Sequence, residues 1–312
     1  MRTTFRFVFL QKKPNTMKKH QQNKKSYYWE DENSQAGGAG ESGNSIKSGF
    51  SLEPFPRMCY DRHGSVNIME QFSRTISLVG QEAFDRVHRA RVAVFGVGGV
   101  GGYVCEALVR SGIAEIDLFD RDDVSISNLN RQIIALHSTI GQDKVDAMAA
   151  RLKDINPDVR VNCRKMFYLP ATADEVDLSV YDFVVDAVDT IAAKLELARR
   201  CEQGGIRFIS SMGAGNKLDP SCLRIADITK TSVCPLARAM RVSCKKKGIR
   251  HMTVAYSLEP MHPPVQPIAE ESGRRKDIPG STAFVPGAMG LLIASHVVRT
   301  LMAGDEPARP EG

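Results

Sequence analysis

The chain has 312 residues, of which 42% are hydrophobic and 25% are charged, with a formal net charge of +6 at pH 7. This length and composition suit one large globular α/β domain or two small ones. No uninterrupted apolar run approaches the roughly 20 residues that cross a bilayer, so we expect no membrane span. The seven cysteines form no Cys-x-x-Cys pair. We therefore expect a reduced, cytoplasmic compartment, with neither a disulfide framework nor structural zinc.

The positive charge is concentrated near the N-terminus. Residues 1–25 contain eight Lys or Arg and no acid, whereas residues 69–312 carry 31 basic and 30 acidic side chains. Residues 1–68 are polar and rich in Gln, Asn, Gly and Lys, so we predict a disordered tail there, and another at 305–312. A targeting peptide and a true start at Met69 are the alternatives for the N-terminal segment.

From residue 69 onward, short apolar runs alternate with amphipathic ones. The run 91–95 is β-branched, apolar and followed at once by glycines, which is typical of a buried parallel strand. The same pattern predicts further strands at 113–119, 159–163, 183–186 and 207–210. It predicts helices at 78–88, 103–110, 143–155 and 191–201. This alternation indicates a Rossmann-like, doubly wound, mostly parallel α/β sheet within residues 69–304.

The second half of the chain predicts a mixed C-terminal extension of this sheet. We expect strands at 222–228 and 252–257, a basic helix at 235–247 and an apolar helix at 288–302. Residues 260–280 are rich in Pro and charge, so we predict a mobile loop there.

The first predicted strand is followed by a glycine motif made of Gly96, Gly98, Gly99 and Gly101. They give the pattern G-x-G-x-x-G between a strand and a helix, where the backbone can approach a phosphate at the helix N-terminus. Asp120 ends the second strand and can accept hydrogen bonds from ribose hydroxyls. These features predict a nucleotide site. A dehydrogenase would also show them, and a glycine-rich turn without a ligand is the plainer alternative.

A polar cluster follows Asp120 directly. Its members are Asp122, Asn128, Asn130, Arg131 and Gln132. A nicotinamide dehydrogenase has no need of such a cluster, whereas Arg131 offers forked donors to phosphate oxygens. Lys144, at the start of the next helix, adds a point charge for the same phosphates. The cluster therefore favours triphosphate binding, and the alternative is that Arg131 and Lys144 are solvated surface charges.

Asp189 follows the strand predicted at 183–186. Ligands of open α/β sheets bind where the parallel strands end, and a carboxylate there can hold Mg²⁺. We therefore predict Asp189 as a magnesium ligand, with a helix cap as the alternative.

Together these motifs resemble the ubiquitin-activating superfamily, which includes the ThiF-type adenylyltransferases of thiamin and molybdopterin synthesis. The specific signal is the string Ser-Asn-Leu-Asn-Arg-Gln at 127–132. Softer strings at 155–157, 213–220, 227–231 and 235–238 are most similar to the branch of bacterial tRNA threonylcarbamoyladenosine dehydratases. The likeness extends over about residues 69–302.

The resemblance implies an enzyme that adenylates a carboxylate with ATP. It implies that Asp120 binds the ribose, and that Asn128 and Arg131 contact the triphosphate. Lys144 would lie beside the α-phosphate, and Asp189 would hold Mg²⁺.

Arg74 matches an N-terminal arginine that in this superfamily reaches the γ-phosphate across a dimer interface. The resemblance therefore implies a homodimer.

The branch resemblance implies an ATP-dependent dehydration that cyclises threonylcarbamoyladenosine next to the anticodon of tRNA. A basic patch could contact the tRNA phosphates, with a solvated helix face as the alternative. Its members are Arg238, Arg241, Lys245, Lys246, Lys247 and Arg250. Two other functions stay open: adenylation of the C-terminal glycine of a ubiquitin-like sulfur carrier, with a sulfur-transfer partner, and non-catalytic nucleotide sensing or scaffolding.

Two departures from the superfamily pattern concern cysteines. The chain lacks the two Cys-x-x-Cys zinc pairs of many carrier-activating members, and the strand at 252–257 has no cysteine. Cys234 is therefore the thiol that we would test as a nucleophile, and a half-buried structural cysteine is the alternative.

Overall fold

The computed structural model describes residues 68–263, 265–266 and 279–304. The predicted tails therefore lie almost wholly outside the described residues, as does most of the predicted loop at 260–280. The helices are α1 (Ile68–Gln71), α2 (Ser73–Val79), α3 (Gln81–Arg89), α4 (Gly101–Arg110), α5 (Lys144–Ile155), α6 (Ile191–Gly204), α7 (Pro235–Lys247) and α8 (Phe284–Ala303). The strands are β1 (Arg91–Phe95), β2 (Glu115–Phe119), β3 (Arg160–Arg164), β4 (Phe183–Asp186), β5 (Phe208–Ser211), β6 (Leu223–Asp227) and β7 (Thr253–Ser257). Short 3₁₀ turns lie at Ile126–Asn128, Ala173–Glu175, Leu178–Val180, Pro220–Cys222 and Ile228–Lys230.

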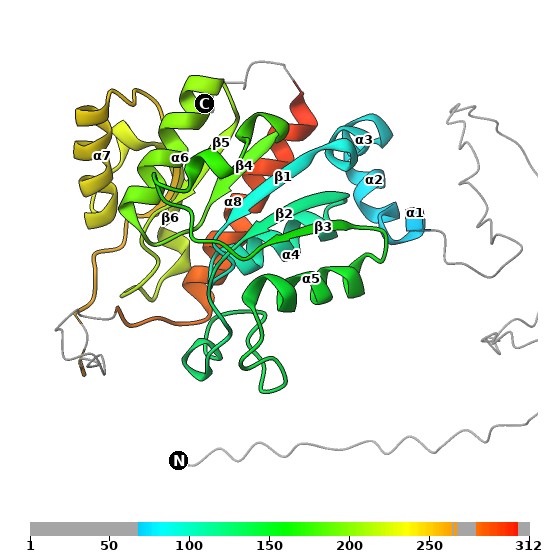
Figure 1. Cartoon of the computed structure of the whole chain (residues 1–312), viewed down its shortest axis with the longest axis horizontal. Coiled ribbons are helices and arrows are strands. Elements are labelled where there is room, and N and C mark those ends of the chain that lie inside the picture. The colour runs from blue at the N-terminus through cyan, green and yellow to red at the C-terminus, as the bar shows by residue number, and fades with distance from the viewer. Residues whose placement is uncertain (1–67, 264, 267–278, 305–312) are drawn as a thin grey trace, which may run out of the picture. The chain divides into compact units, whose positions relative to one another are not determined.

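The strands form one seven-stranded sheet in the order β3-β2-β1-β4-β5-β7-β6 (Figure 1). All neighbouring strands are parallel except β6, which runs antiparallel to β7. The chain winds outward from β1 to β3, then returns to place β4 on the other side of β1. The prediction of a doubly wound, mostly parallel sheet with a mixed C-terminal part is therefore confirmed, and its switch point lies between β1 and β4.

Helices cover both faces of the sheet because each central strand is apolar on both sides. Val92 and Val94 of β1 pack into a core with α4, α5 and α8, whereas Ala93 and Phe95 face the layer that contains α6. A further core lies between α6 and α7, over β7. Burial on both faces explains why β1 is a continuous apolar run in the sequence.

Two predicted helices differ most from the structure. The helix predicted at 78–88 is split by Gly80, whose φ of 82° lies outside the helical region, so α2 ends and α3 begins there. The last helix begins at Phe284, four residues earlier than predicted, since Pro286 lies in the first turn, where no backbone N–H is needed.

Helix α8 is, by length and apolar composition, long enough to cross a membrane, and it is the one helix of the described residues with that property. More than half of it is buried in the protein, however, where it packs along α4 and α3. Its apolar sequence is explained by this central position in the core.

Candidate active site

The glycine turn fills the narrow space between the ends of β1 and β4. Gly96 has a φ of 89°, and a Cβ atom at this position would lie 2.7 Å from the carbonyl oxygen of Ala187. A Cβ atom at Gly101 would lie 1.8 Å from the carbonyl oxygen of Gly96. The backbone therefore folds so tightly that neither position has room for a side chain, and α4 begins directly behind the turn.

Asp120 holds the glycine turn in place. Its Oδ2 accepts a hydrogen bond from the Val97 N–H at 2.7 Å, and its Oδ1 accepts one from the Asp122 N–H at 2.9 Å. Each carboxylate oxygen keeps a second lone pair. Asp120 can thus support the turn and still accept hydrogen bonds from ribose hydroxyls.

The segment after β2 folds back over the glycine turn. A Cβ atom at Gly99 would lie 3.4 Å from Cγ of Arg131, so the arginine stem covers the turn. The Arg131 guanidinium donates through Nη1 to the Ser127 carbonyl at 2.9 Å and to Oδ1 of Asn130 at 3.0 Å. Asn128 is buried and its Oδ1 accepts a hydrogen bond from the Ser125 N–H, which shapes this segment. The structure therefore brings the predicted cluster and the glycines together.

Lys144 joins the same site from the start of α5. Its Nζ donates to Oδ2 of Asp122 at 2.8 Å, and its side chain is only 8% exposed. The Lys144 N–H also donates to the Asp122 carbonyl. These bonds fix the ammonium beside the end of β2.

Asp189 lies on the turn after β4, at the edge of the sheet where β1 and β4 end. It is exposed, and one of its carboxylate oxygens accepts a hydrogen bond from the Thr190 hydroxyl at 3.2 Å. Within the described residues, no group of three His, Cys, Asp or Glu side chains is placed to hold a metal. A single exposed carboxylate is nevertheless compatible with Mg²⁺, which commonly takes one or two carboxylates and completes its shell with phosphate oxygens and water.

Arg74 is not part of this site within one chain. It lies exposed on α2. Phe72, the residue before α2, packs on Phe84 of α3, and the two ring centroids are 5.2 Å apart. Arg86 of α3 donates in turn to the Met302 carbonyl near the C-terminal end of α8. Figure 1 shows α2 and α3 at the far side of the sheet from the loops that follow β2.

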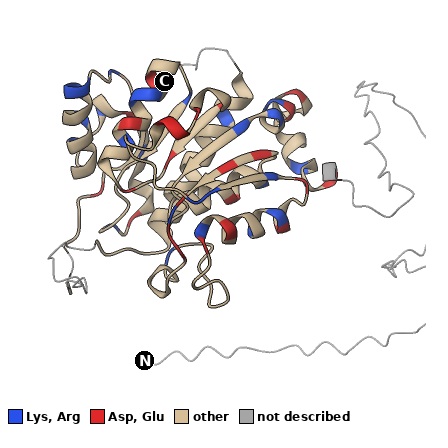
Figure 2. Cartoon of the chain, viewed as in Figure 1, with Lys and Arg blue, Asp and Glu red and all other residues tan. Residues whose placement is uncertain are grey.

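The basic patch is largely exposed on α7 and the loop after it (Figure 2). Arg241 differs from the other members, because it is partly buried and its Nη1 donates to the carbonyl and hydroxyl of Thr231. That arginine holds the segment before α7 and is less available to a partner. Cys234, just before α7, is only 3% exposed and packs in the core under that helix.

Two buried residues near the glycine turn were given no individual role from the sequence. Gln132 is 7% exposed and its Nε2 lies 3.8 Å from the Cβ position of Gly98, while its Oε1 has no hydrogen-bond partner among the described residues. Gln132 stands in the motif string, which was the available signal. Lys194 is buried behind Asp189 and is 1% exposed. Nothing in the local sequence distinguishes it from a surface lysine of an amphipathic helix.

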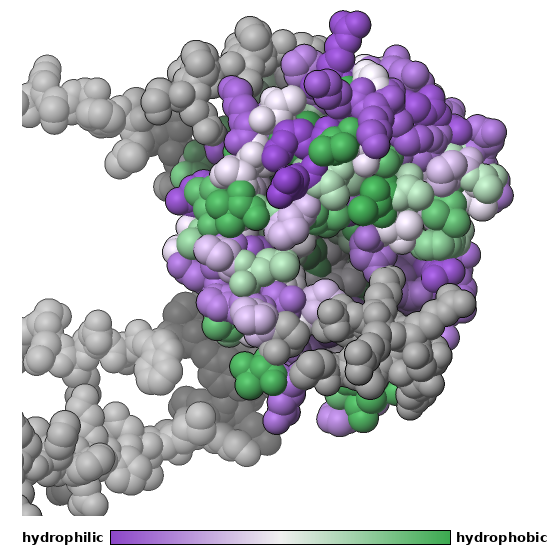
Figure 3. All heavy atoms as spheres, turned by 90° about the vertical axis from the view of Figure 1, so that its left-hand side faces the viewer, coloured by the Kyte–Doolittle hydropathy of each residue, from purple (hydrophilic) through white to green (hydrophobic). Residues whose placement is uncertain are grey.

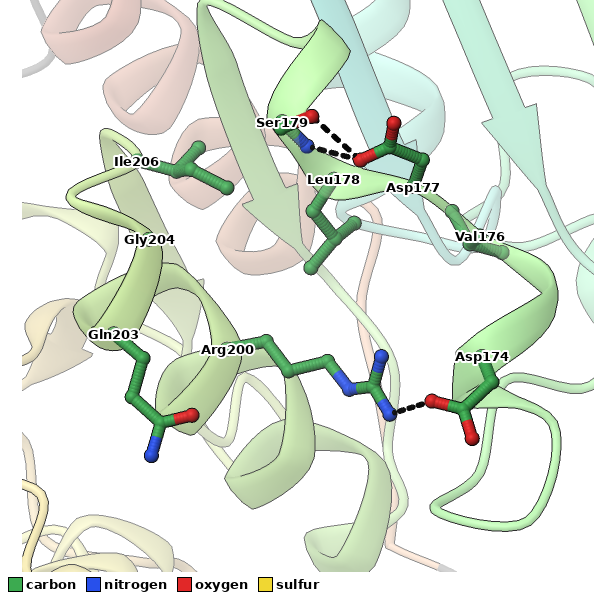
Figure 4. A pocket seen from close by; sticks show the side chains of 9 residues that line it. All are labelled: Asp174, Val176, Asp177, Leu178, Ser179, Arg200, Gln203, Gly204 and Ile206. Carbon is green, nitrogen blue, oxygen red and sulfur yellow. Dashed lines mark hydrogen bonds and ion pairs between the residues drawn. The ribbon is translucent and has the colours of Figure 1, made fainter.

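A surface hollow lies at the opposite edge of the sheet, where β4 and β5 begin (Figure 4). Its rim contains Asp174, Asp177 and Arg200, and its floor is apolar. Nη2 of Arg200 is paired with Asp174 at 2.6 Å, and Nε of Arg200 with Glu196 at 2.7 Å. This hollow is remote from the glycine turn and contributes nothing to the nucleotide site.

A glycine turn, an acidic residue after β2 and a cationic cluster at the switch point of this sheet define a nucleotide-binding α/β protein. The model of the ThiF family matches residues 72–311, so the chain belongs to the ThiF family. It is similar to the tRNA threonylcarbamoyladenosine dehydratase of Bacillus subtilis (strain 168), with 43% identity over 256 residues, 78% of this chain and 98% of that protein. The protein of the same name from Escherichia coli (strain K12) is 32% identical over 252 residues, 75% of this chain and 94% of that protein. The resemblance inferred from the motifs is therefore confirmed.

Solved structures agree with this placement. The E. coli tRNA N6-threonylcarbamoyladenosine dehydratase in complex with ATP has a TM-score of 0.67 at 32% identity and covers 75% of this chain and 94% of its own. The complex of the same protein with AMP has a TM-score of 0.68. A shorter match, 34% identical over 128 residues, is the sulfur carrier protein adenylyltransferase of Thermus thermophilus, of which 47% is covered.

Proposed function

We propose that this protein is an ATP-dependent tRNA threonylcarbamoyladenosine dehydratase that activates the threonyl carboxylate by adenylation. The observation that carries the proposal is that Arg131 lies against the glycine turn, while Lys144 is bonded to Asp122, whose N–H donates to the Asp120 that holds the same turn. A triphosphate bound at the turn would meet both cations. Two relatives that bear this name, from B. subtilis and E. coli, align with the chain over 98% and 94% of their length, and the E. coli protein has been solved with ATP.

The proposed reaction has two steps. A carboxylate oxygen of the threonyl group attacks the α-phosphorus of ATP, the bond from that phosphorus to the bridging oxygen breaks, and pyrophosphate leaves. A nucleophile within the same modified nucleoside then attacks the activated carbonyl carbon, and AMP leaves with the former carboxylate oxygen. The nucleoside is thereby cyclised with the net loss of one water.

The protein's part in this reaction is positioning and charge stabilisation. Arg131 offers a planar pair of donors to phosphate oxygens, and Lys144 offers a compact charge beside them. Asp189 would hold Mg²⁺, which would neutralise charge on the triphosphate when bound. Asp120 would receive the ribose. An Asp189→Ala variant should require much more Mg²⁺ for half-maximal nucleotide binding, because it lacks the carboxylate proposed to hold the ion.

Arg74 would act in a homodimer, reaching the γ-phosphate in the site of the other copy. In favour of this role, α2 buries none of its own residues, and Leu78 on it is 85% exposed. Arg74 and Leu78 lie one turn apart on this helix, so both are open to contact with a second copy of the chain. Sedimentation should show a dimer, and an Arg74→Ala variant should regain activity when it is mixed with a Lys144→Ala variant, since a mixed dimer has one intact site.

The tRNA would bind along α7, whose last turn contains Lys245, Lys246 and Lys247 and which has no acidic residue. Figure 3 shows the side of the molecule that carries α7, with hydrophilic side chains gathered in its upper part and apolar patches below. Cationic side chains without neighbouring acids attract a phosphate backbone. The six described cysteines are all free, which agrees with a reaction in the reducing cytoplasm.

Two measurements test the proposal. Exchange of labelled pyrophosphate into ATP should be stimulated by tRNA that carries threonylcarbamoyladenosine, and mass analysis of the nucleosides should show the loss of one water. Unmodified tRNA is the matched control and should stimulate neither signal. If a ubiquitin-like sulfur carrier stimulates exchange and modified tRNA does not, the protein is instead an adenylyltransferase, and a sulfur-transfer partner is then expected. ATP binding without exchange under either condition would leave a nucleotide sensor or scaffold.

A further inference from the structure

A buried ion pair lies directly behind the turn that carries Asp189. Lys194 of α6 is 1% exposed and Asp186, the last residue of β4, is fully buried. Nζ of Lys194 lies 3.3 Å and 3.2 Å from the two carboxylate oxygens of Asp186, and it donates to the Ser211 carbonyl at 2.7 Å. The Ser210 hydroxyl donates to Oδ2 of Asp186 at 2.5 Å.

Such a pair is not explained by stability alone. Removing two charges from water is unfavourable, and their mutual attraction in the interior only partly offsets that loss. Buried ion pairs in other proteins can be replaced by apolar residues with no loss of stability. We therefore asked which neighbouring segments the ion pair between Lys194 and Asp186 holds in position.

The ion pair borders the proposed nucleotide site. Oδ1 of Asp186 accepts a hydrogen bond from the Val188 N–H at 3.1 Å, which closes the turn leading to Asp189. The Ala187 N–H donates to the Phe95 carbonyl at 2.7 Å, and the Ala187 carbonyl lies against Gly96. One buried carboxylate thus sets the turn 187–189, which both supports the glycine turn and presents Asp189.

We propose that Lys194 is a positioning residue, which fixes the turn 187–189 through Asp186 and so holds Asp189 and the glycine turn in the arrangement that binds ATP with Mg²⁺. The ammonium holds the Asp186 carboxylate in one orientation, because it contacts both of its oxygens. In that orientation Oδ1 faces the Val188 N–H, so loss of the ammonium would free the carboxylate to rotate and would weaken this hydrogen bond. This inference rests on the proposed function, since it assigns Lys194 to the ATP site.

The test compares a Lys194→Met variant with a Lys217→Met variant. Lys217 is a second buried lysine, 3% exposed, whose Nζ donates to the Glu259 carbonyl on the loop after β7. Both substitutions remove a buried ammonium and keep a similar side-chain volume, but only the first removes a partner of Asp186. A Ser210→Ala variant removes one hydrogen bond to Asp186. It replaces Lys194→Met in the same measurements if Lys194→Met does not fold.

Three quantities are measured: the dissociation constant of a fluorescent ATP analogue, the Mg²⁺ concentration for half-maximal binding, and backbone hydrogen exchange of the nucleotide-free protein. Lys194→Met should raise the first two by about tenfold or more, as loss of a supporting partner behind a metal ligand commonly does. Exchange should accelerate at residues 187–190 more than in the rest of the sheet. Lys217→Met should leave both binding quantities within about twofold of the wild type.

Failure of this inference is distinct from failure of the proposed function. If the wild type does not bind the ATP analogue, the proposed function falls. If the wild type binds it, and a folded Lys194→Met or Ser210→Ala variant matches it in both binding quantities, the positioning role is overturned. Equal acceleration of hydrogen exchange throughout the sheet would also overturn it, because that is the signature of a general loss of stability.

Discussion

Nζ of Lys144 lies 2.8 Å from Oδ2 of Asp122, although 22 residues separate the two along the chain. The lysine side chain is 8% exposed and the aspartate side chain 56% exposed, so the pair lies at the mouth of the site with the ammonium on its inner side. Lys144 uses one of its three N–H donors on Asp122, which leaves two donors for the phosphate oxygens that we propose it binds. Asp122 therefore orients the Lys144 ammonium and leaves two of its N–H groups available to a ligand.

We predict that Lys144→Ala lowers the rate of pyrophosphate exchange by about 10²- to 10³-fold, the usual loss when one donor to a developing charge is removed. Asp122→Asn should lower it less, because the amide oxygen can still accept from Nζ. Lys153→Ala changes an exposed lysine of the same helix and is the control. The measurement is exchange at saturating ATP and modified tRNA, and equal rates for Lys144→Ala and Lys153→Ala would contradict the assignment.

Gly96 and Gly141 offer a matched pair for testing the close packing of the glycine turn. Both have a positive φ, 89° and 84°, but a Cβ atom at Gly96 would strike Ala187, whereas one at Gly141 would meet nothing within 4 Å. Gly141→Ala should lower the free energy of unfolding by only roughly 1–2 kcal/mol, because a Cβ atom strains a left-handed backbone. Gly96→Ala should lower the free energy of unfolding by more than this. It should also weaken ATP binding, because the glycine turn must shift away from β4. Denaturant unfolding and nucleotide titration provide the two readouts, and indistinguishable variants would disprove the steric argument.

Glu196 predicts an acid-sensitive contribution to stability. The hydrogen bond from Arg199, together with that from Arg200, lowers the pKa of Glu196 to about 2. In the unfolded chain a glutamate titrates near 4.3, so the folded state gains stability above that pH and loses it as pH falls toward 2. We expect about 1–2 kcal/mol, reduced by the partial exposure of both arginines.

A Glu196→Gln variant should therefore be less stable than the wild type at pH 7, and the difference should shrink by pH 3. Chemical unfolding at several pH values measures it. Glu82→Gln is the control, because Glu82 is 91% exposed in its pair with Arg86 and should change stability little at any pH. A difference between Glu196→Gln and wild type that does not vary with pH would refute the linkage.

The exposed lysines of α7 should govern tRNA affinity. Replacing Lys245, Lys246 and Lys247 together with Glu should weaken binding and flatten the dependence of log affinity on log salt, by up to about 0.7–0.9 for each phosphate that the protein no longer neutralises. Arg241→Ala should affect affinity less, because that side chain is bonded to Thr231. Filter binding over a range of salt concentrations measures both quantities. An unchanged salt slope in the triple variant would remove α7 from the tRNA surface.

Much of the fold could be predicted because its signals are local. Buried parallel strands appear as short apolar runs, so β1 was predicted with its observed bounds. Helix α7 was also predicted with its observed bounds. Boundaries failed where one residue altered the local rule, as at Gly80, which ended a helix inside an apolar pattern, and at Pro286, which looks like a breaker but is tolerated in a first turn. Periodicity indicates what a segment is, whereas its ends depend on single backbone conformations.

The sequence by itself determined that the chain has a glycine turn after its first strand and a polar cluster with Arg131 after its second, because glycine spacing and side-chain chemistry are properties of neighbouring residues. Only the tertiary structure decided that Lys144 is directed by Asp122, that Gln132 lies over Gly98, and that Arg74 lies away from the site of its own chain. The burial of Lys194 was likewise decided only by the tertiary structure. These facts depend on contacts between segments far apart in sequence, and such contacts arise from how the whole sheet packs its helices, which no local pattern records.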